Sequence, residues 1–429
     1  MPAESFPKRL TIVQRQVEQL RALLAELRPG NKFYAAKYDA AGVHKRISSL
    51  AEFFDRFPFT TKQELVEDQL ANPPYGTNLT YPPDRYTRSH QTSGTAGAPL
   101  RWLDTPESWN WMLTSWEEIL RAAGVTRADR LFFAFSFGPF IGFWLAFEAA
   151  ARLGCFCLPS GGLSSAARLR LILDHGATVL CCTPSYAIHL GEVAAEEKID
   201  LAGSQVKLII VAGEQGGSIP ATRACIEGLW PGARVFDHHG MTEVGPVSFE
   251  CSARPGVLHI LESAYVAEVL EPGAATPVEA GQTGELVLST LGRTGSPLLR
   301  YRTGDLVKRA LDTVCVCGRS DLALEGGILS RTDDMVVVRG VNIYPSAVEE
   351  IIRACGGVAE YQVRISTVAA LTEMALQIEP AAGCPDAAVL ARKIENDLAS
   401  SFGLRVPVSV APAGTLPRFD QKAKRWVRA

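Results

Sequence analysis

The feature that most constrains the fold is an alternation of short apolar segments with helix-like segments between residues 130 and 240. The apolar runs are RLFFAF, GCFCLPS, ATVLCCT, VKLIIVAG and ARVFDHHG, and the stretches between them are 142–153, 165–174, 186–197 and 220–229. The apolar runs show no polar alternation, which is typical of strands buried on both faces. The sequence therefore predicts an α/β fold with a mostly parallel sheet.

The pattern changes after residue 255 and again after residue 335. Residues 259–272, 284–292 and 306–312 read as strands joined by turns without long helices. After 335, the run VVVRG, a helix from Pro345 to Gly356, a second apolar-faced helix around 390–402 and the strand VPVSV form a compact α+β unit. We therefore predict a large N-terminal α/β domain of several subdomains, 1–332, and a small mobile C-terminal α+β lid domain, 333–429.

An amphipathic helix is predicted over residues 10–27, ended by Pro29 and Gly30. Its apolar positions are Leu10, Val13, Val17, Leu20, Leu24 and Leu27, at alternating spacings of three and four. We expect this helix to dock on its own core, and its apolar face leaves a homodimer open.

Composition excludes several classes of protein. Hydrophobic residues make up 47% of the chain, charged residues 21%, and the net charge is −3, as in ordinary folded proteins and unlike disordered ones. With no basic block, we expect neither nucleic acid nor a membrane as a partner.

The start, MPAESFPKRL, lacks the apolar stretch of a secretory signal, which predicts a cytoplasmic protein with ten reduced cysteines. The 17 uncharged residues between Arg130 and Glu148 are interrupted by Gly138 and Pro139, which favours buried structure over a membrane span.

Three short strings have the residue types of a nucleotide site. The run Gln91 to Pro99, QTSGTAGAP, offers backbone N–H and hydroxyl donors suited to polyphosphate. The run DHHGMTEVG follows a predicted strand, and ligands of open α/β sheets bind at the carboxyl ends of strands, so Thr242 and Glu243 are placed to meet phosphate and Mg²⁺. In YRTGDL, Asp305 can accept hydrogen bonds from two ribose hydroxyls. Two further strings are RTDDM, running into VRGVNIYP, and the terminal PRFDQKAKR. Taken singly each is an ordinary turn or tail; their order and spacing carry the argument.

In that order the five strings resemble the core motifs of the adenylate-forming superfamily (acyl-CoA synthetases, adenylation domains and luciferases), and within it the phenylacetate-CoA ligase family. The resemblance extends over nearly the whole chain and includes NKFYAAKYDAAGV and CTPSYAIHL. It implies a two-step reaction. A carboxylate attacks the α-phosphate of ATP to give an acyl-adenylate and pyrophosphate; the small domain then rotates, and the thiol of coenzyme A displaces AMP to form a thioester. Two anions must approach each other, so cations and hydrogen-bond donors have to be aimed at the developing charge.

The resemblance also implies roles for individual residues. It assigns the phosphate loop to Ser93, Gly94, Thr95 and Gly97, the adenine-binding turn to Gly213 and Glu214, and the adjoining strand end to Asp237, His238, His239, Gly240 and Met241. It assigns phosphate contact to Thr242, Mg²⁺ binding to Glu243, ribose binding to Asp305 and nucleotide contact to Arg331. It assigns the hinge to Asp333 and the coenzyme A-facing loop to Arg339 and Gly340. The catalytic cation is assigned to Lys422, and the nearby Lys424 has no such role.

This chain departs from the family pattern at several of these positions. Ala96 and Ala98 replace residues that are more often Thr and Lys, and His239 replaces an aromatic residue that stacks near adenine. Glycines common in the family are replaced by Gln421 before the catalytic lysine and by Ser330 before the nucleotide-contacting arginine. Glu243, Asp305 and Lys422 are retained, which favours catalysis over nucleotide or acyl binding alone.

The acyl pocket is expected at Phe135, Phe137, Phe140, His238 and Pro246, which fall where the resembling ligases line an aryl pocket. This implies an aromatic carboxylic acid substrate, arylacetate or benzoate-like. Phe135 and Phe137 stand where the family tends to have tyrosines, which implies a more apolar acid or a polar substrate group answered by His238. An adenylating enzyme that passes its acyl group to a carrier protein or an amine, and a non-catalytic binding protein, stay open as alternatives.

A second constellation is Cys251-x₇-His259 with Cys315-Val316-Cys317. Three thiols and an imidazole satisfy the ligand count of a closed, structural Zn²⁺ site, and similar residues occur in the phenylacetate-CoA ligase-like group. The C-x-C spacing is tighter than the usual C-x₂₋₄-C, and unrelated loop cysteines are the alternative.

Overall fold

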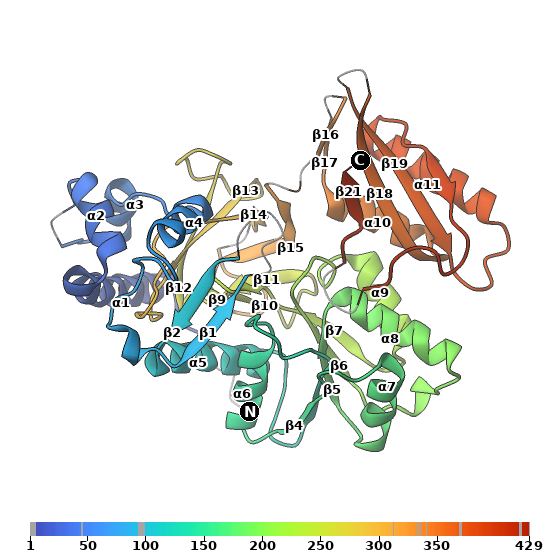
Figure 1. Cartoon of the computed structure of the whole chain (residues 1–429), viewed down its shortest axis with the longest axis horizontal. Helices are drawn as coiled ribbons and strands as arrows, with labels where there is room; N and C mark the ends of the chain where they lie inside the picture. The colour runs from blue at the N-terminus through green and yellow to red at the C-terminus, as the bar shows by residue number, and fades with distance from the viewer. Residues whose placement is uncertain are drawn as a thin grey trace.

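The computed structural model has a large N-terminal domain and a small C-terminal domain (Figure 1). It describes residues 6–43, 46–92, 99–311, 313–332, 334, 336–339, 341–368, 371–419 and 423–428. Both domains mix helices and strands, which confirms the predicted fold class.

A five-stranded parallel sheet forms the centre of the large domain. Its strand order is β4-β3-β5-β6-β7, with bounds β3 (Arg130–Phe133), β4 (Phe156–Pro159), β5 (Val179–Cys182), β6 (Leu208–Val211) and β7 (Arg234–Asp237). Successive side chains point into two different cores: Leu131 and Phe133 lie in one, and Phe132 and Leu180 in the other. Because both faces are covered, the inner strands β5 and β6 are apolar and buried at every position, as the sequence indicated.

Helices connect these strands: α6 (Trp144–Arg152), α7 (Ser165–Asp174), α8 (Pro184–Glu196) and α9 (Pro220–Leu229). Proline occupies the first turn of α8 and of α9, where its missing N–H costs no helical hydrogen bond. The uncharged segment after Arg130 forms β3, a turn and α6. Within the described part of the chain, no helix has the length and apolarity needed to cross a membrane.

A six-stranded antiparallel sheet lies beside the parallel one. Its order is β10 (Ser248–Glu250), β11 (Val257–Ile260), β15 (Ala323–Arg331), β14 (Tyr301–Arg309), β13 (Thr283–Thr290) and β12 (Tyr265–Leu270). In the register of β14 and β15, Asp305 pairs with Arg331. Two strings that lie far apart in the sequence are therefore neighbours in this sheet.

The first part of the chain packs helices against this sheet. These elements are α1 (Arg9–Gly30), α2 (Lys32–Ala40), α3 (Leu50–Arg56), α4 (Lys62–Ala71) and α5 (Pro106–Ala122), with a hairpin of β1 (Arg88–Gln91) and β2 (Arg101–Asp104). Helix α1 includes Pro29 and ends at Gly30, where a Cβ atom would lie 2.1 Å from the carbonyl oxygen of Thr80.

The predicted apolar stripe of α1 is wrong at its N-terminal end. Leu10 is 70% exposed, while Ile12 and Gln16 are buried. The Gln16 amide donates a hydrogen bond to the carbonyl oxygen of Tyr265 at 2.8 Å. A polar contact with β12 therefore sets the rotation of this turn of the helix, and hydrophobic spacing alone does not reveal it.

The small domain has its own core, built on a four-stranded sheet of order β20-β19-β18-β21. Its elements are β16 (Val336–Val338), β17 (Val341–Ile343), α10 (Pro345–Cys355), β18 (Val358–Val368), β19 (Leu371–Pro380), α11 (Ala387–Phe402), β20 (Val408–Val410) and β21 (Trp426–Arg428). The two helices and β20 match the predicted unit, whereas the long β18–β19 hairpin was not predicted. In Figure 1 this domain, in orange and red, rests beside α8 and α9, and α10 packs on α9.

Candidate functional site

Within the described residues, the predicted motifs around Gly213, Asp237, Asp305 and Arg331 meet where the carboxyl ends of β6 and β7 approach β14 and β15. The turn after β6 carries Gly213, whose φ of +95° suits glycine, followed by Glu214. After β7 the chain enters the short ladder of β8 (Gly240–Met241) with β9 (Gly245–Pro246). This is the edge at which open α/β sheets bind ligands.

Asp305 brings three of the predicted nucleotide residues together. One carboxylate oxygen, Oδ2, lies 3.1 Å from Nε2 of His239, and Oδ1 lies 3.2 Å from Nη1 of Arg331. At Gly304 the φ is +76°, and a Cβ atom there would lie 2.9 Å from Nη2 of Arg331, so a side chain would disturb this contact. Two cationic or neutral donors thus hold a buried carboxylate in a fixed orientation, with lone pairs left to accept further hydrogen bonds.

The carboxylate of Glu243 is buried and forms an ion pair with Lys62. The Lys62 Nζ lies 3.4 Å from Oε1 of Glu243, at the start of α4. Burial raises the pKa of Tyr301 well above its usual value, and the charge of Glu243 adds to this effect. A single carboxylate fits Mg²⁺, which is usually held by one or two carboxylates together with substrate phosphates. Sequence reasoning missed Lys62.

The backbone of the predicted phosphate-contacting turn is held by a buried arginine. Nη1 of Arg293 donates hydrogen bonds to the carbonyl oxygens of Thr242 at 2.7 Å and Glu243 at 2.9 Å. The same guanidinium group binds the carboxylate of Asp104, the last residue of β2. Nothing in the sequence pairs residues 104 and 293, so this support was not predicted.

Asp237 contacts the interior of the turn. Its carboxylate accepts hydrogen bonds from the Ser218 hydroxyl at 2.5 Å and from the backbone N–H of His238 at 3.0 Å. Burial raises the pKa of Asp237. These contacts stabilise the end of β7, and they leave the Asp237 side chain only 8% exposed.

A continuous row of aromatic rings leads away from this edge of the sheet. Its ring-centroid distances are 5.4 Å from Phe137 to Phe135, 5.9 Å from Phe135 to Phe143, 6.2 Å from Phe143 to Trp116 and 4.3 Å from Trp116 to His238. We call these five side chains the aromatic row. The sequence analysis identified Phe135, Phe137 and His238. It missed Phe143, directly before α6, and Trp116 of α5.

The other two predicted pocket residues lie outside this row. Phe140 is half-buried in the turn before α6, and Pro246 is buried in β9. Phe137 has a φ of +52°, a conformation that is uncommon for residues other than glycine and that occurs often at functional sites.

The His238 ring donates a hydrogen bond through Nδ1 and stays neutral. Its Nδ1 lies 2.6 Å from the carbonyl oxygen of Ser248, and only a protonated ring nitrogen can donate to a carbonyl. Burial lowers the pKa of His238 to about 3, so the other nitrogen, Nε2, carries a lone pair at neutral pH. That nitrogen faces Gly240, where a Cβ atom would lie 3.3 Å away.

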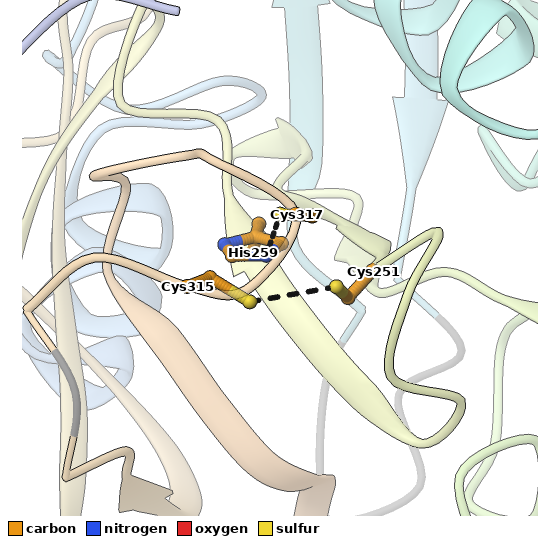
Figure 2. A group of neighbouring side chains, drawn as sticks. All are labelled: Cys251, His259, Cys315 and Cys317. Carbon is orange, nitrogen blue, oxygen red and sulfur yellow. Dashed lines mark hydrogen bonds between the residues drawn. The ribbon is translucent and has the colours of Figure 1, made fainter.

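The predicted cysteine–histidine group is assembled as Figure 2 shows. Sγ of Cys251 lies 3.6 Å from Sγ of Cys315, and Sγ of Cys317 lies 3.4 Å from Nε2 of His259. The four potential ligand atoms all lie within 4.8 Å of one another. They come from the end of β10, from β11 and from the turn between β14 and β15. Three thiols and one imidazole in this arrangement fit a tetrahedral Zn²⁺.

The small domain reaches the same edge of the parallel sheet. The backbone N–H of Ala423 donates a hydrogen bond to Oε2 of Glu214 at 2.8 Å, and Nη1 of Arg425 donates to the Ser185 hydroxyl at 3.3 Å. Arg339 takes no part in these contacts. It is half-exposed, has a φ of +49° and pairs with Glu373 of β19 at 2.7 Å. The remaining predicted site residues, Ser93, Gly94, Thr95, Gly97, Asp333, Gly340 and Lys422, lie outside the described residues.

Fold and site together define a two-domain, adenylate-forming enzyme. The family model for the AMP-binding enzyme matches residues 52–294, and that for the AMP-binding enzyme C-terminal domain matches residues 340–428. A phenylacetate-coenzyme A ligase from Thermus thermophilus is 31% identical over 429 aligned residues, covering 94% of this chain and 93% of that protein. The chain belongs to the phenylacetate-CoA ligase family of the adenylate-forming superfamily.

A solved relative resembles this structure closely in one of its states. A 2-hydroxyisobutyryl-CoA ligase in the postadenylation state superimposes with a TM-score of 0.93 at 27% identity, covering 100% of this chain and 92% of that one. The same ligase in the thioesterification state, with coenzyme A, superimposes with a TM-score of 0.74 at 28% identity, covering 99% and 91%. The relative placement of the two domains here is therefore that of the postadenylation state.

Proposed function

We propose that this protein is an ATP- and Mg²⁺-dependent ligase that converts an aromatic carboxylic acid, arylacetate or benzoate-like, to its acyl-adenylate and then to its coenzyme A thioester. The aromatic row is the observation that supports an aromatic substrate. It begins at His238, whose neighbour His239 contacts the ribose-binding candidate Asp305. A flat apolar acid lying along these rings would present its carboxylate to the nucleotide end of the site.

The roles proposed for the chain's own groups follow from charge. Lys422 provides a compact positive charge between the substrate carboxylate and the α-phosphate. Arg293 fixes the backbone of Thr242 and Glu243, so the Thr242 hydroxyl and the Glu243 carboxylate face the phosphates in a constant geometry. Mg²⁺, held by Glu243 and phosphate oxygens, would supply charge neutralisation when bound.

The substrate test is AMP release from ATP and Mg²⁺ across a panel of acids, each with and without coenzyme A. The panel contains phenylacetate, benzoate, hydroxy- and amino-benzoates, and 2-hydroxyisobutyrate. Coenzyme A-dependent release with an aromatic acid supports the proposal. Release with 2-hydroxyisobutyrate alone contradicts the aromatic substrate, and release without coenzyme A points to a carrier protein or an amine as the acceptor.

A matched pair of variants separates an enzyme from a binding protein. Lys422→Ala is expected to abolish acyl-adenylate formation, because the approach of two anions then has no side-chain cation between them. Lys424→Ala, two residues away, is expected to retain it. Equal activity of both variants with the unsubstituted protein would refute the role of Lys422.

We also propose a structural Zn²⁺ held by Cys251, His259, Cys315 and Cys317. Burial lowers the pKa of His259 to about 4, which leaves a neutral imidazole suited to a metal. The ion would tie the edge strand β10 and its neighbour β11 to the turn before β15. Glu250 of β10 in turn forms an ion pair with Arg223 of α9. Metal analysis of the purified protein should give one Zn²⁺ per chain, and Cys315→Ser should lose it and unfold more easily. A folded, metal-free protein would contradict this assignment. The cytoplasmic location and the homodimer stay predictions from sequence.

A further inference from the structure

The carboxylate of Glu214 joins two segments of the chain that belong to different domains. Its Oε1 accepts a hydrogen bond from the backbone N–H of Ser185 at 2.8 Å, in the first turn of α8. Its Oε2 accepts one from the backbone N–H of Ala423 at 2.8 Å, in the small domain. We call this pair of bonds the Glu214 bridge. A carboxylate at the N-terminus of a helix is stabilised by the helix dipole, so the anion has a favourable site there.

Arg425 adds a second link at the same place. Its Nε donates to Oε1 of Glu360 at 2.6 Å and its Nη2 to Oε2 of Glu360 at 3.2 Å, which fixes the guanidinium group within the small domain. The remaining Nη1 donates to the Ser185 hydroxyl at 3.3 Å. The segment from Ala423 to Arg425 is thus held against the start of α8 by both its backbone and a side chain.

These contacts are specific to one placement of the small domain. The structure matches the postadenylation state of the solved relative at a TM-score of 0.93 and the thioesterification state at 0.74. The Glu214 bridge crosses the boundary between the two domains, so a rotation of the small domain separates its two ends. The large domain keeps the Glu214–Ser185 bond through such a rotation, because both residues belong to it.

We infer that Glu214 is a positioning residue for the adenylation step, acting through the peptide N–H of Ala423. This inference rests on the proposed function, because Ala423 directly follows Lys422 in the chain. A charge-assisted hydrogen bond to the next peptide group restricts where Lys422 can be presented. When the small domain rotates, water replaces Ala423 at Oε2, and the bridge plays no part in thioester formation.

The test compares the two half-reactions in Glu214→Gln. The amide keeps the size of the side chain but has one acceptor oxygen, so Ser185 or Ala423 must face an NH₂ group and lose its acceptor. Acid-dependent exchange of pyrophosphate into ATP, at saturating ATP, should fall about tenfold or more. Thioester formation from supplied acyl-adenylate and coenzyme A should stay within about twofold of the unsubstituted protein. Glu196→Gln, at the exposed far end of α8, is the matched control and should leave both rates unchanged.

Two outcomes would overturn the inference. An equal fall in both half-reactions would mean that Glu214 acts through adenine binding or folding, since the acyl-adenylate carries adenine too. An unchanged exchange rate would mean that the bridge has no effect on adenylation. Ser185→Ala, which removes only the hydroxyl that Arg425 contacts, should lower the exchange rate by about two- to threefold and spare the second step.

A measurement without substrate keeps the inference testable if the proposed function fails. Hydrogen–deuterium exchange of the backbone amides at residues 423–428 should be faster in Glu214→Gln than in the unsubstituted protein, with the same thermal unfolding midpoint. Unchanged exchange there would overturn the Glu214 bridge itself. If no acid supports pyrophosphate exchange in the unsubstituted protein, the proposed function fails independently of this result.

Discussion

Arg293 and Asp104 form a bidentate ion pair in which neither side chain has any exposed surface. Nε of Arg293 lies 2.7 Å from Oδ1 of Asp104, and Nη2 lies 2.6 Å from Oδ2. The pair joins β2 to the loop after β13. The third nitrogen of Arg293, Nη1, donates hydrogen bonds to the carbonyl oxygens of Thr242 and Glu243. The same guanidinium group therefore forms a buried ion pair and holds the backbone of the turn that we propose to contact phosphate.

Breaking this pair should reduce both stability and adenylation. Arg293→Lys retains the charge but cannot form the two parallel bonds, and we expect a loss of about 3 kcal/mol in the free energy of unfolding, because Asp104 stays buried without its full partner. Urea denaturation measures this loss, and pyrophosphate exchange measures the effect on the turn. Arg85→Lys is the control: Arg85 pairs with Glu107 at the surface, and we expect a change below about 0.5 kcal/mol. Equal effects of the two substitutions would contradict the role of Arg293.

Selection of the acid should depend on the lone pair of His238 Nε2. An acid that carries a hydroxyl or amino donor near this nitrogen gains a hydrogen bond, whereas the matching acid without the donor leaves the nitrogen unpaired. In His238→Phe the preference for hydroxy- or amino-substituted acids over their unsubstituted parents should fall about tenfold, as a ratio of kcat/KM values. A preference that survives the substitution would assign the donor to another partner.

The pH dependence of that preference follows from the same residue. The folded pKa of His238, about 3, lies below its usual value near 6.5, so the ring stays neutral in the folded protein at and above pH 5. The ratio of kcat/KM values should therefore be constant between about pH 6 and pH 9. Because the unfolded chain binds the proton first, His238 also contributes stability that is complete above its unfolded pKa and is lost as the pH falls toward 3. A preference that titrates near pH 6.5 would contradict the neutral assignment.

The small domain should lose stability in acid through Glu379. Burial alone would raise the pKa of this carboxyl, but hydrogen bonds from Arg418 and from the backbone N–H groups of Gly414 and Leu416 outweigh burial and hold the pKa below its usual 4.5. The stabilisation is therefore present above about pH 4.5 and is lost as the pH falls further. Below that pH, the protection of the β19 amides against hydrogen–deuterium exchange, relative to the intrinsic exchange rate at each pH, should fall.

Glu379→Gln provides the check on this assignment. The amide cannot be protonated in this range, so the variant should be less stable than the unsubstituted protein at pH 7, by about 2 kcal/mol, with a weaker dependence on acid. An identical acid dependence in both proteins would assign the transition to another carboxyl.

Asp305→Asn should weaken ATP binding more than it slows turnover. The amide presents an NH₂ group to either His239 or Arg331, both of which contact the present carboxylate. We expect the KM for ATP to rise about tenfold, with kcat changed by less than about threefold. Glu279→Gln, an exposed position in the turn before β13, is the control. A fall in kcat at constant KM would place Asp305 in the chemistry instead of in nucleotide binding.

The sequence predicts those parts of this molecule that depend on local patterns. The parallel sheet follows from apolar runs with helical spacers, and nucleotide contacts could be predicted for Asp305 and Arg331 because both belong to recognisable strings. The pairing of Arg293 with Asp104 could not be predicted, because nothing local to either residue specifies a partner 189 positions away. Trp116 of the aromatic row was missed for the same reason: on a buried helix, an aromatic residue that packs a core and one that lines a pocket have the same local pattern.

The backbone of Thr332 donates a hydrogen bond to the carbonyl oxygen of Gly304 at 2.6 Å, beside the contact of Arg331 with Asp305. The chain is thus anchored to β14 up to the last residues before the small domain. The hinge predicted at Asp333 directly follows this anchored residue. A small rotation about this hinge would displace α11 and β20 over large distances. It would move Arg331 and Asp305, beside the hinge, very little. Rotation about this predicted hinge would therefore reposition the small domain while the contact of Arg331 with Asp305 stays in place.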